Sequence, residues 1–230
     1  MRLVTYRSAR GPRAGLIRDD RVIDVWQALG GEGSSVRDLL AADRLADATE
    51  VSGEESLPLE RAELLPPIPD PEKVVCIGLN YRDHAAEAGI DPPETPTFFA
   101  KFRNALAPPG ATVPLPAASG KVDYEAEVAF VVGRRCSEVA EGVAAECVAG
   151  YMLFDDLSAR DLQFATPQWM PGKVFDGSAP CGPALVSPDE ALADGAISFS
   201  LTLNGEEMQS ATTDDLIFSV PQLLAHLSSV

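Results

Sequence analysis

Two glutamates two residues apart are the first candidates for chemistry in this chain. Glu125 and Glu127 lie in a strongly strand-like stretch, 124–132, and side chains at positions i and i+2 of a strand point to the same face. Carboxylates that close repel each other unless positive charge lies between them. A hard divalent cation such as Mg²⁺, Mn²⁺ or Ca²⁺ would supply that charge. An edge strand with a solvated acidic face is the alternative, and the spacing alone favours it.

A histidine and a glutamate at helical spacing form a second candidate. His84 precedes Glu87 by three residues in a stretch, 81–88, that is expected to be a helix ending at Gly89. Side chains three residues apart on a helix are neighbours, so the carboxylate can orient the imidazole and stabilise its charged form. A general base needs that arrangement. An ordinary surface pair explains the spacing equally well. The other histidine, His226, is expected on a helix face near the chain end.

Two further charged residues occur where they could reach a site. Asp156 ends the apolar run 151–156, and an acid after buried residues is unfavourable unless it is paired, caps a helix or binds a metal. A helix N-cap or an ion pair with Arg160 is the alternative to metal binding. Lys173 is expected in a loop that leads into a strand. The alternative for Lys173 is an ordinary solvent-exposed lysine.

The composition excludes several classes of partner. With 35 acidic and 18 basic residues, the formal net charge is −17, which disfavours nucleic acid and anionic membrane surfaces. The first residues lack the apolar run of a signal peptide, and no stretch approaches the roughly 18 apolar residues that span a membrane. We therefore expect a cytoplasmic protein without a membrane or nucleic-acid partner.

The cysteines do not form any of the usual metal or redox motifs. They show no C-x-x-C spacing and have no neighbouring histidine: Cys76, Cys136, Cys147 and Cys181. Cys76 and Cys181 lie in apolar or Pro/Gly-rich stretches and are expected to be reduced thiols. The nucleophile-elbow, phosphate-loop, zincin and dinucleotide-binding motifs are also absent from the sequence.

Short strands dominate the elements expected around these residues. Strands are predicted at 3–6, 14–17, 21–25, 73–78, 124–132, 151–155, 198–203 and 208–212. Helices are predicted at 36–40, 81–88, 141–149 and 221–227. The last two strands flank Asn204-Gly205, a hairpin signal, although the connection between them is predicted to be longer than two residues. The proline-rich stretch 90–118 is expected to form loop and strand.

The chain is predicted to divide at a second proline-rich stretch. Residues 65–72 contain four prolines, which suit neither a helix nor a central strand. We predict a small N-terminal domain at 1–64, a linker at 65–72 and a catalytic domain at 73–230.

Four motifs in this order resemble those of the fumarylacetoacetate hydrolase family. They cover roughly residues 70–220: Ile77–Glu87, Asp123–Val128, Asp155–Gln163, and Gly172–Asp176 followed by Pro180–Pro183. Such an ordered set is far more specific than any one of its parts. The resemblance implies an α+β fold, in which a mixed β-sandwich roll is preceded by a small α/β N-terminal domain of the kind found in bacterial members.

The resemblance also implies a site and the roles of its residues. The ligands of a Mg²⁺ or Mn²⁺ ion, with Ca²⁺ as an alternative, would be Glu125, Glu127 and Asp156. His84 and Glu87 would form a dyad that activates water. Contacts with substrate oxygens would come from Lys173, Gln163, Arg82 and Lys101. Members of the family are usually homodimers that act on small anionic β-diketo or 2-oxo acids.

The sequence departs from the family pattern in two places. Val174 replaces the usual serine, and 176–179 replaces a bulkier stretch, so the pocket wall after Lys173 is expected to be altered. Family members continue beyond the position of Val230 through further strands and a Thr-Gly-Thr-Pro loop. We therefore expect the C-terminal part of the catalytic domain to be missing from this chain.

These residues predict a metal-dependent hydrolase that cleaves a C–C bond in a β-diketo acid. The metal would chelate the 2-oxo-carboxylate end of the substrate, His84 would deprotonate water, and Lys173 would stabilise the developing anion. The segment 90–118 would close over the site. One alternative is decarboxylation of oxaloacetate-like acids, or tautomerisation or isomerisation of hydroxydienoates, on the same metal. A non-catalytic binding protein on a retained scaffold is the alternative from another class.

Overall fold

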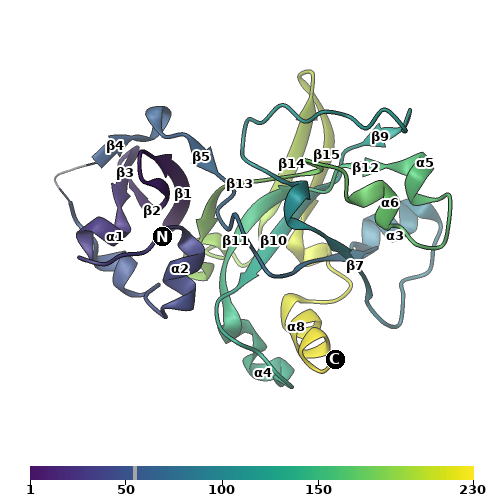
Figure 1. The fold of residues 1–230 in the computed structure, drawn as a ribbon. Helices are drawn as coiled ribbons and strands as arrows, with labels where there is room; N and C mark the ends of the chain where they lie inside the picture. The colour runs from purple at the N-terminus through teal and green to yellow at the C-terminus, as the bar shows by residue number, and fades with distance from the viewer. Residues whose placement is uncertain (54–55) are drawn as a thin grey trace.

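A computed structural model describes residues 1–53 and 56–230, so residues 54–55 of the predicted domain 1–64 lie outside the described part. The elements form an α+β fold. The N-terminal strands and helices lie at one side of the molecule, and α3 (Arg82–Ala88), α5 (Arg160–Gln163) and α6 (Met170–Lys173) lie at the other (Figure 1). No helix within the described residues is long and apolar enough to cross a membrane.

The largest sheet runs from the N-terminal strands to β10 near the middle of the molecule (Figure 1). In the described part of the chain it has nine strands, in the order β10-β11-β13-β1-β2-β3-β4, with β5 on β1 and β8 on β13. All of its pairs are antiparallel except β8 with β13. The strands are β1 Arg2–Ser8, β2 Gly11–Arg18, β3 Arg21–Asp24, β4 Ser56–Pro58, β5 Leu64–Leu65, β8 Leu106–Ala107, β10 Ala126–Val132, β11 Val148–Asp155 and β13 Ala179–Val186.

The N-terminal strands form the predicted meander. Asp19 and Asp20 both have positive φ, 50° and 57°, as a two-residue hairpin turn requires. The helices α1 (Val25–Ala28) and α2 (Val36–Ala41) pack on this meander, and Asp24 caps α1 by accepting a hydrogen bond from the Gln27 amide. Their apolar faces form one core with the strands, which includes Leu3, Leu16, Val25, Trp26, Val36 and Leu39.

The sheet continues from the N-terminal strands into the rest of the chain. Arg2 and Leu3 of β1 pair with Val186 and Leu185 of β13, and Thr5 Oγ1 donates a hydrogen bond of 2.7 Å to the Pro67 carbonyl. Strand β1 is therefore hydrogen-bonded both to its own meander and to the strand that follows Lys173. The division at 65–72 stays a prediction.

Within residues 1–53 and 56–230, three two-stranded sheets complete the β-structure. They pair β6 Val74–Gly78 with β7 Thr97–Lys101, β9 Val122–Asp123 with β12 Ser158–Ala159, and β14 Ser198–Leu203 with β15 Glu206–Thr212. The remaining helices are α4 Glu141–Ala144, α7 Pro188–Ala191 and α8 Val220–Ser228, and α4 packs against α8. Single 3₁₀ turns lie at Asp47–Glu50, Leu59–Arg61, Arg103–Ala105, Ala145–Cys147 and Thr213–Asp215.

Several predicted boundaries are wrong, each for a local reason. The strand predicted at 124–132 begins at Ala126, so Glu125 precedes it. The helix predicted at 141–149 ends earlier, because Val148 already belongs to β11 and is buried in the core with Tyr151. The loop between β14 and β15 has two residues, since β15 begins at Glu206. Asn204 and Gly205 have φ of 53° and 87°, which gives the short hairpin turn that this dipeptide favours.

Candidate functional site

Four charged side chains from distant segments meet in the core beside α6. Lys101 ends β7, Glu125 precedes β10, Asp156 follows β11, and Lys173 ends α6. Lys101 Nζ donates to Asp156 Oδ1 at 2.7 Å, and Lys173 Nζ donates to Asp156 Oδ2 at 3.0 Å and to Glu125 Oε2 at 2.6 Å. We call these residues the lysine–carboxylate cluster. The Lys173 ammonium thus lies between two carboxylates.

The cluster is almost completely removed from solvent. The exposed fraction of the side chain is 0% for Lys101, 2% for Lys173, 4% for Asp156 and 17% for Glu125. Buried charges are tolerated only when they are paired and hydrogen-bonded, and here two ammonium groups face two carboxylates. Burial lowers the pKa of Lys101, while Asp156 opposes that change. Lys101 also donates to the backbone carbonyl of Lys173, which fixes the end of α6.

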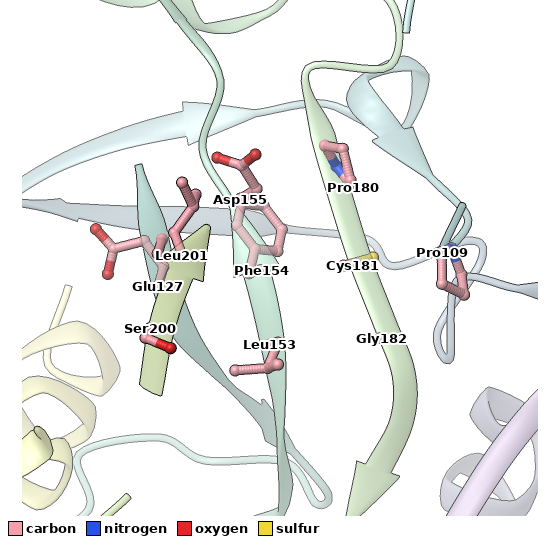
Figure 2. A pocket seen from close by; sticks show the side chains of 11 residues that line it. Pro109, Glu127, Leu153, Phe154, Asp155, Pro180, Cys181, Gly182, Ser200 and Leu201 are labelled. Atoms are coloured by element: carbon pink, nitrogen blue, oxygen red, sulfur yellow. The ribbon is translucent and has the colours of Figure 1, made fainter. Parts of the chain in front are cut away.

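Glu127 adds a third carboxyl group beside the cluster. It lies on β10 opposite Phe154 of β11. Burial, together with the negative charges of Glu125 and Asp156, raises the pKa of Glu127 to about 8. Its carboxyl group makes no hydrogen bond or ion pair with the residues that the structure describes. Glu127 lines a cavity of about 220 Å³ (Figure 2), whose other walls come from Pro109, Ala126, Leu153, Phe154, Asp155, Pro180, Cys181, Gly182, Ser200 and Leu201.

The donor set suits a hard divalent cation, although Lys173 holds its central position here. Glu125, Glu127 and Asp156 are oxygen donors, which Mg²⁺ and Mn²⁺ prefer, and they lie close enough for their charges to interact. Among residues 1–53 and 56–230, no group of three or more His, Cys, Asp or Glu side chains is arranged to hold a metal ion. The Lys173 ammonium bridges Glu125 and Asp156 and stands in for the positive charge that these carboxylates need.

Arg160 is a member of the site that the motifs did not single out for a role. It begins α5 and donates from Nε and Nη2 to Asp123 Oδ2 at 2.9 and 2.7 Å. Its Nη1 donates to Glu125 and, at 3.1 Å, to Gln163 Oε1. The alternative pairing of Arg160 with Asp156 is therefore wrong. In the sequence, the only sign of such a role was that Arg160 follows the acidic pair Asp155-Asp156. Its partners could not be predicted, because they depend on how β9 pairs with β12.

Lys173 lies in a short helix rather than in the predicted loop before a strand, and it is buried rather than exposed. A close backbone contact sets its position. A Cβ atom on Gly172 would lie 2.6 Å from both the Ala159 carbonyl oxygen and the Gln163 amide nitrogen. Only glycine allows α6 to approach α5 and β12 so closely. The Lys173 carbonyl also accepts a hydrogen bond of 2.9 Å from Ser178 Oγ.

Helix α3 begins near the cluster, but its polar side chains are exposed. Asn80 is tied to Phe218 by two hydrogen bonds of 2.9 and 3.1 Å. Burial raises the pKa of Tyr81, and the negative charge of Glu127 adds to that rise, so the start of α3 lies within electrostatic reach of the cluster. His84 and Glu87 are exposed and make no hydrogen bond or ion pair with described residues. The dyad therefore stays a prediction.

The other predicted substrate contacts lie in different surroundings. Gln163 is buried and bonded to Arg160, whereas Arg82 is exposed and donates to the Asp214 carbonyl at 3.5 Å. Lys101 points into the cluster rather than toward open space. His226 lies in α8, as predicted, and its ring stacks on Phe98 with centroids 5.4 Å apart.

Comparison with known proteins assigns the family. A family profile described as fumarylacetoacetate (FAA) hydrolase C-terminal matches residues 73–230. The chain belongs to the fumarylacetoacetate hydrolase family. It is 34% identical to a fumarylacetoacetate hydrolase domain-containing protein 2 homolog of Dictyostelium discoideum, covering 100% of this chain and 81% of that protein. It is 35% identical to the mitochondrial oxaloacetate tautomerase of Xenopus laevis, covering 99% and 75%.

Solved structures of this family share the fold over the whole chain. A Mycobacterium smegmatis protein with the provisional name HpcE has a TM-score of 0.89 and 37% identity, covering 100% of this chain and 82% of that one. A 5-carboxymethyl-2-hydroxymuconate delta-isomerase from the same species has a TM-score of 0.79 and 30% identity, covering 100% and 82%. Maleylpyruvate hydrolase of Sphingobium sp. SYK-6, solved with manganese(II) and pyruvate, has a TM-score of 0.77 and 26% identity, covering 100% and 83%. The family thus includes hydrolases, isomerases and tautomerases.

Proposed function

We propose that this protein enolises a small 2-oxo acid, as a metal-dependent tautomerase or isomerase. The observation that carries the proposal is the buried bridge of Lys173 between Glu125 and Asp156, which is a fixed set of charges in a nearly dry site. His84, by contrast, is exposed and has no partner among the described residues. The related oxaloacetate tautomerase and hydroxymuconate isomerase catalyse reactions that need no attack by water.

Enolisation has one main electrostatic requirement. A base takes a proton from C3 of the 2-oxo acid, the electrons of the C–H bond form the C2–C3 double bond, and negative charge develops on the C2 oxygen. That oxygen must meet a preorganised positive charge, which is worth more in a water-poor site than in solution. We assign this role to the Lys173 ammonium, whose direction is set by α6. The proton then returns to oxygen, which gives the enol, or to a distant carbon, which gives the isomer.

A divalent cation fits the same chemistry. Glu125, Glu127 and Asp156 would hold it, and when bound it would supply Lewis-acid stabilisation of the charge on the 2-oxo-carboxylate group. We infer Mg²⁺ or Mn²⁺, in keeping with the manganese in the related maleylpyruvate hydrolase. The local positive charge also offsets the net charge of −17, which repels an anionic substrate.

The position of Lys101 in the cluster supports a different role from the predicted contact with substrate. With no exposed side-chain surface, it holds Asp156 and the carbonyl of Lys173. We therefore propose that Lys101 is a positioning residue. Gln163 is proposed as a substrate contact, because Arg160 binds its amide oxygen and leaves the amide NH₂ group as a donor. Arg82 keeps its predicted role as a substrate contact.

Hydrolysis of a C–C bond is the second candidate. The spacing of His84 and Glu87 on α3 supports it, and so does the start of that helix near Glu127. In that reaction His84 would deprotonate the water that attacks the distal carbonyl. The carbanion that leaves would still need the Lys173 charge, so both candidates share the cluster and differ in their need for α3.

A substrate panel with three variants tests the proposal. With Mn²⁺ or Mg²⁺ present, we expect conversion of oxaloacetate enol to be faster than hydrolysis of maleylpyruvate. Lys173→Met should lower that rate by about 10²–10³-fold, whereas His84→Ala should leave it nearly unchanged. Lys73→Met, which removes an exposed lysine, is the matched control. Faster hydrolysis that is lost in His84→Ala would instead establish the hydrolase, and no turnover at all would favour a binding protein.

Two properties of the whole protein also remain proposals. We propose that it forms a homodimer and acts in the cytoplasm, as the family resemblance and the composition predict. Sedimentation analysis of the purified chain checks the first, since a monomer at all concentrations contradicts it. Fractionation of the source cells checks the second.

A further inference from the structure

The two ends of the connection between β10 and β11 bring two cysteines together. Val132 pairs with Val148 at the end of this antiparallel pair, and the Gly133 amide donates to the Cys147 carbonyl at 2.8 Å. Cys136 lies three residues beyond Gly133 and packs against the same apolar cluster that contains Cys147. The backbone pairing therefore brings the segment after Gly133 back to Cys147, and both cysteines meet on one cluster although their sequence spacing fits no redox motif.

The surroundings of this pair favour a reactive thiol. Interaction with the Cys136 thiol and with the Arg134 guanidinium lowers the pKa of the Cys147 thiol. The Cys136 thiol also donates a hydrogen bond of 3.3 Å to the Arg134 carbonyl. Burial raises the pKa of Cys136 to about 11, and its contact with Cys147 adds to that rise. Arg134 and Glu146, which pair at 3.1 Å, are 57% and 66% exposed. Cys147 is only 5% exposed, but unlike the buried Cys181 it lies next to a solvent-exposed cation, which is one feature of reactive cysteines.

We propose that Cys136 and Cys147 form a thiol pair that hydroperoxides oxidise to an intramolecular disulfide. Cys147 is the attacking thiol and Cys136 the resolving one. The pair is separate from the lysine–carboxylate cluster, and the inference does not depend on the proposed function.

The chemistry balances in two steps. The Cys147 thiolate attacks one oxygen of hydrogen peroxide, the O–O bond breaks, and hydroxide leaves, so that Cys147 becomes a sulfenic acid. The sulfur of Cys136 then attacks Cys147 and gives up its proton, the S–O bond breaks, and water leaves. In sum, two thiols lose two electrons and two protons to one peroxide molecule, which becomes two water molecules.

The remaining cysteines serve as internal controls. Cys181 is buried and its pKa is raised by burial to about 12. Burial likewise raises the pKa of Cys76. Neither has a cysteine among the groups that shift its pKa, so the same oxidant should leave both reduced.

The cross-link would also act on the C-terminal helix. The Glu138 amide donates to the Ser228 carbonyl at 2.8 Å, and the Val139 amide donates to Ser228 Oγ at 3.0 Å. Both donors lie between the two cysteines in the sequence. Closing that segment restricts the unfolded chain more than the folded one, so oxidation should raise the melting temperature.

Peptide mapping tests the pair directly. The full chain is treated with hydrogen peroxide, unfolded in an alkylating reagent and digested with trypsin, which leaves both cysteines in one peptide, Cys136–Arg160. We expect this peptide to be two hydrogen atoms lighter and unalkylated, with alkylation restored by a reductant. Digestion after glutamate should release two fragments that stay linked until reduction. Cys76 and Cys181 should remain fully alkylated in the same sample.

Two variants assign the roles within the pair. In Cys136→Ser, the sulfenic acid on Cys147 has no resolving partner and should be trapped by dimedone. In Cys147→Ser, Cys136 should stay a thiol. The inference is overturned if Cys136 and Cys147 can still be alkylated at a peroxide dose that already oxidises Cys76 or Cys181. It is also overturned if Cys136→Ser gives no dimedone adduct on Cys147.

Discussion

The lysine–carboxylate cluster and helix α3 carry the two halves of the predicted chemistry, and they are held in opposite ways. The cluster joins residues as far apart in sequence as Lys101 and Lys173, and its side chains are at most 17% exposed. Among the described residues, the hydrogen bonds that tie helix α3 to the rest of the chain lie near its start. They involve Asn80, Arg82 and the Asp83 amide, which donates to Asp215 at 2.9 Å. Its His84 and Glu87 face solvent.

This difference separates two kinds of catalytic contribution. Charges that are buried and mutually bonded are preorganised, and they stabilise an anion without rearranging at the moment of reaction. A base on an exposed helix becomes effective only when substrate or a movement of the helix brings the two together. We infer that stabilisation of the enolate belongs to the fixed cluster, and that any activation of water is added by α3.

The largest effect is expected from removing the shared counter-charge of the two lysines. Asp156→Asn leaves Lys101 and Lys173 buried with one carboxylate fewer. Because an uncompensated buried charge is strongly unfavourable, the free energy of unfolding should fall by about 3–5 kcal/mol. Urea denaturation measures it. Glu87→Gln on α3 is the control and should change stability by less than about 0.5 kcal/mol. Similar values for both variants would remove the contrast between the two regions.

The second effect depends on pH and concerns Glu127. Its pKa in the folded protein is about 8, above the ordinary value of 4.5, so the folded state holds a proton that the unfolded state has lost. Without metal, stability should therefore fall as pH rises from about 4.5 to about 8 and then level off. Glu127→Gln should abolish this decline, as thermal melting across that range would record.

The same variant tests the metal site. If Glu127 is a ligand, Mn²⁺ should raise the melting temperature of the unaltered protein, more at pH 9 than at pH 6, because binding requires the ionised carboxylate. Glu127→Gln should lose most of this gain. An equal gain in both proteins would exclude Glu127 as a ligand.

A smaller effect is expected at Arg160. Arg160→Lys replaces a planar fork that contacts Asp123, Glu125 and Gln163 with a single ammonium. Because the pairs are partly exposed, stability should fall by only about 1 kcal/mol. The KM for substrate should rise, since Glu125 and Gln163 lose a fixed partner. Arg134→Lys, at an exposed pair with Glu146, is the matched control, and an equal change in KM there would contradict the role of Arg160.

The smallest effect is expected at His84. His84→Ala removes an exposed side chain without a partner among the described residues, so the free energy of unfolding should change by less than about 0.5 kcal/mol. Thermal melting without metal measures this. A clear loss of stability would mean that His84 is packed or paired more closely than its exposure indicates.

Local sequence patterns predicted the helices and strands more accurately than they predicted the contacts between them. The three N-terminal strands and α3 follow from short-range chemistry, since α3 ends at Gly89 with a φ of 64°, in the left-handed region that glycine favours. The hairpin at Asn204-Gly205 was recognised, but its loop was given too many residues. The β11 boundary was missed because burial of Val148 in the sheet outweighs the helical pattern before it.

The candidate site was harder to predict, because it is built from long-range contacts. The motifs named Glu125, Asp156 and Lys173, and the structure brings these three into contact, while their roles stay predictions. The burial of Lys101 and the partners of Arg160 depend on strand pairing between segments far apart in sequence. So does the contact between Cys136 and Cys147, which no spacing rule would find.

The close contact at Gly172 means that the position of the Lys173 ammonium is set by the main chain. A single methyl group on Gly172 would collide with the backbone of β12 and α5. The distance between α6 and those segments therefore cannot accommodate any other residue at this position. Selection for a longer or shorter substrate therefore cannot move the Lys173 ammonium by small steps through this position. Such adaptation has to come from other side chains around the site.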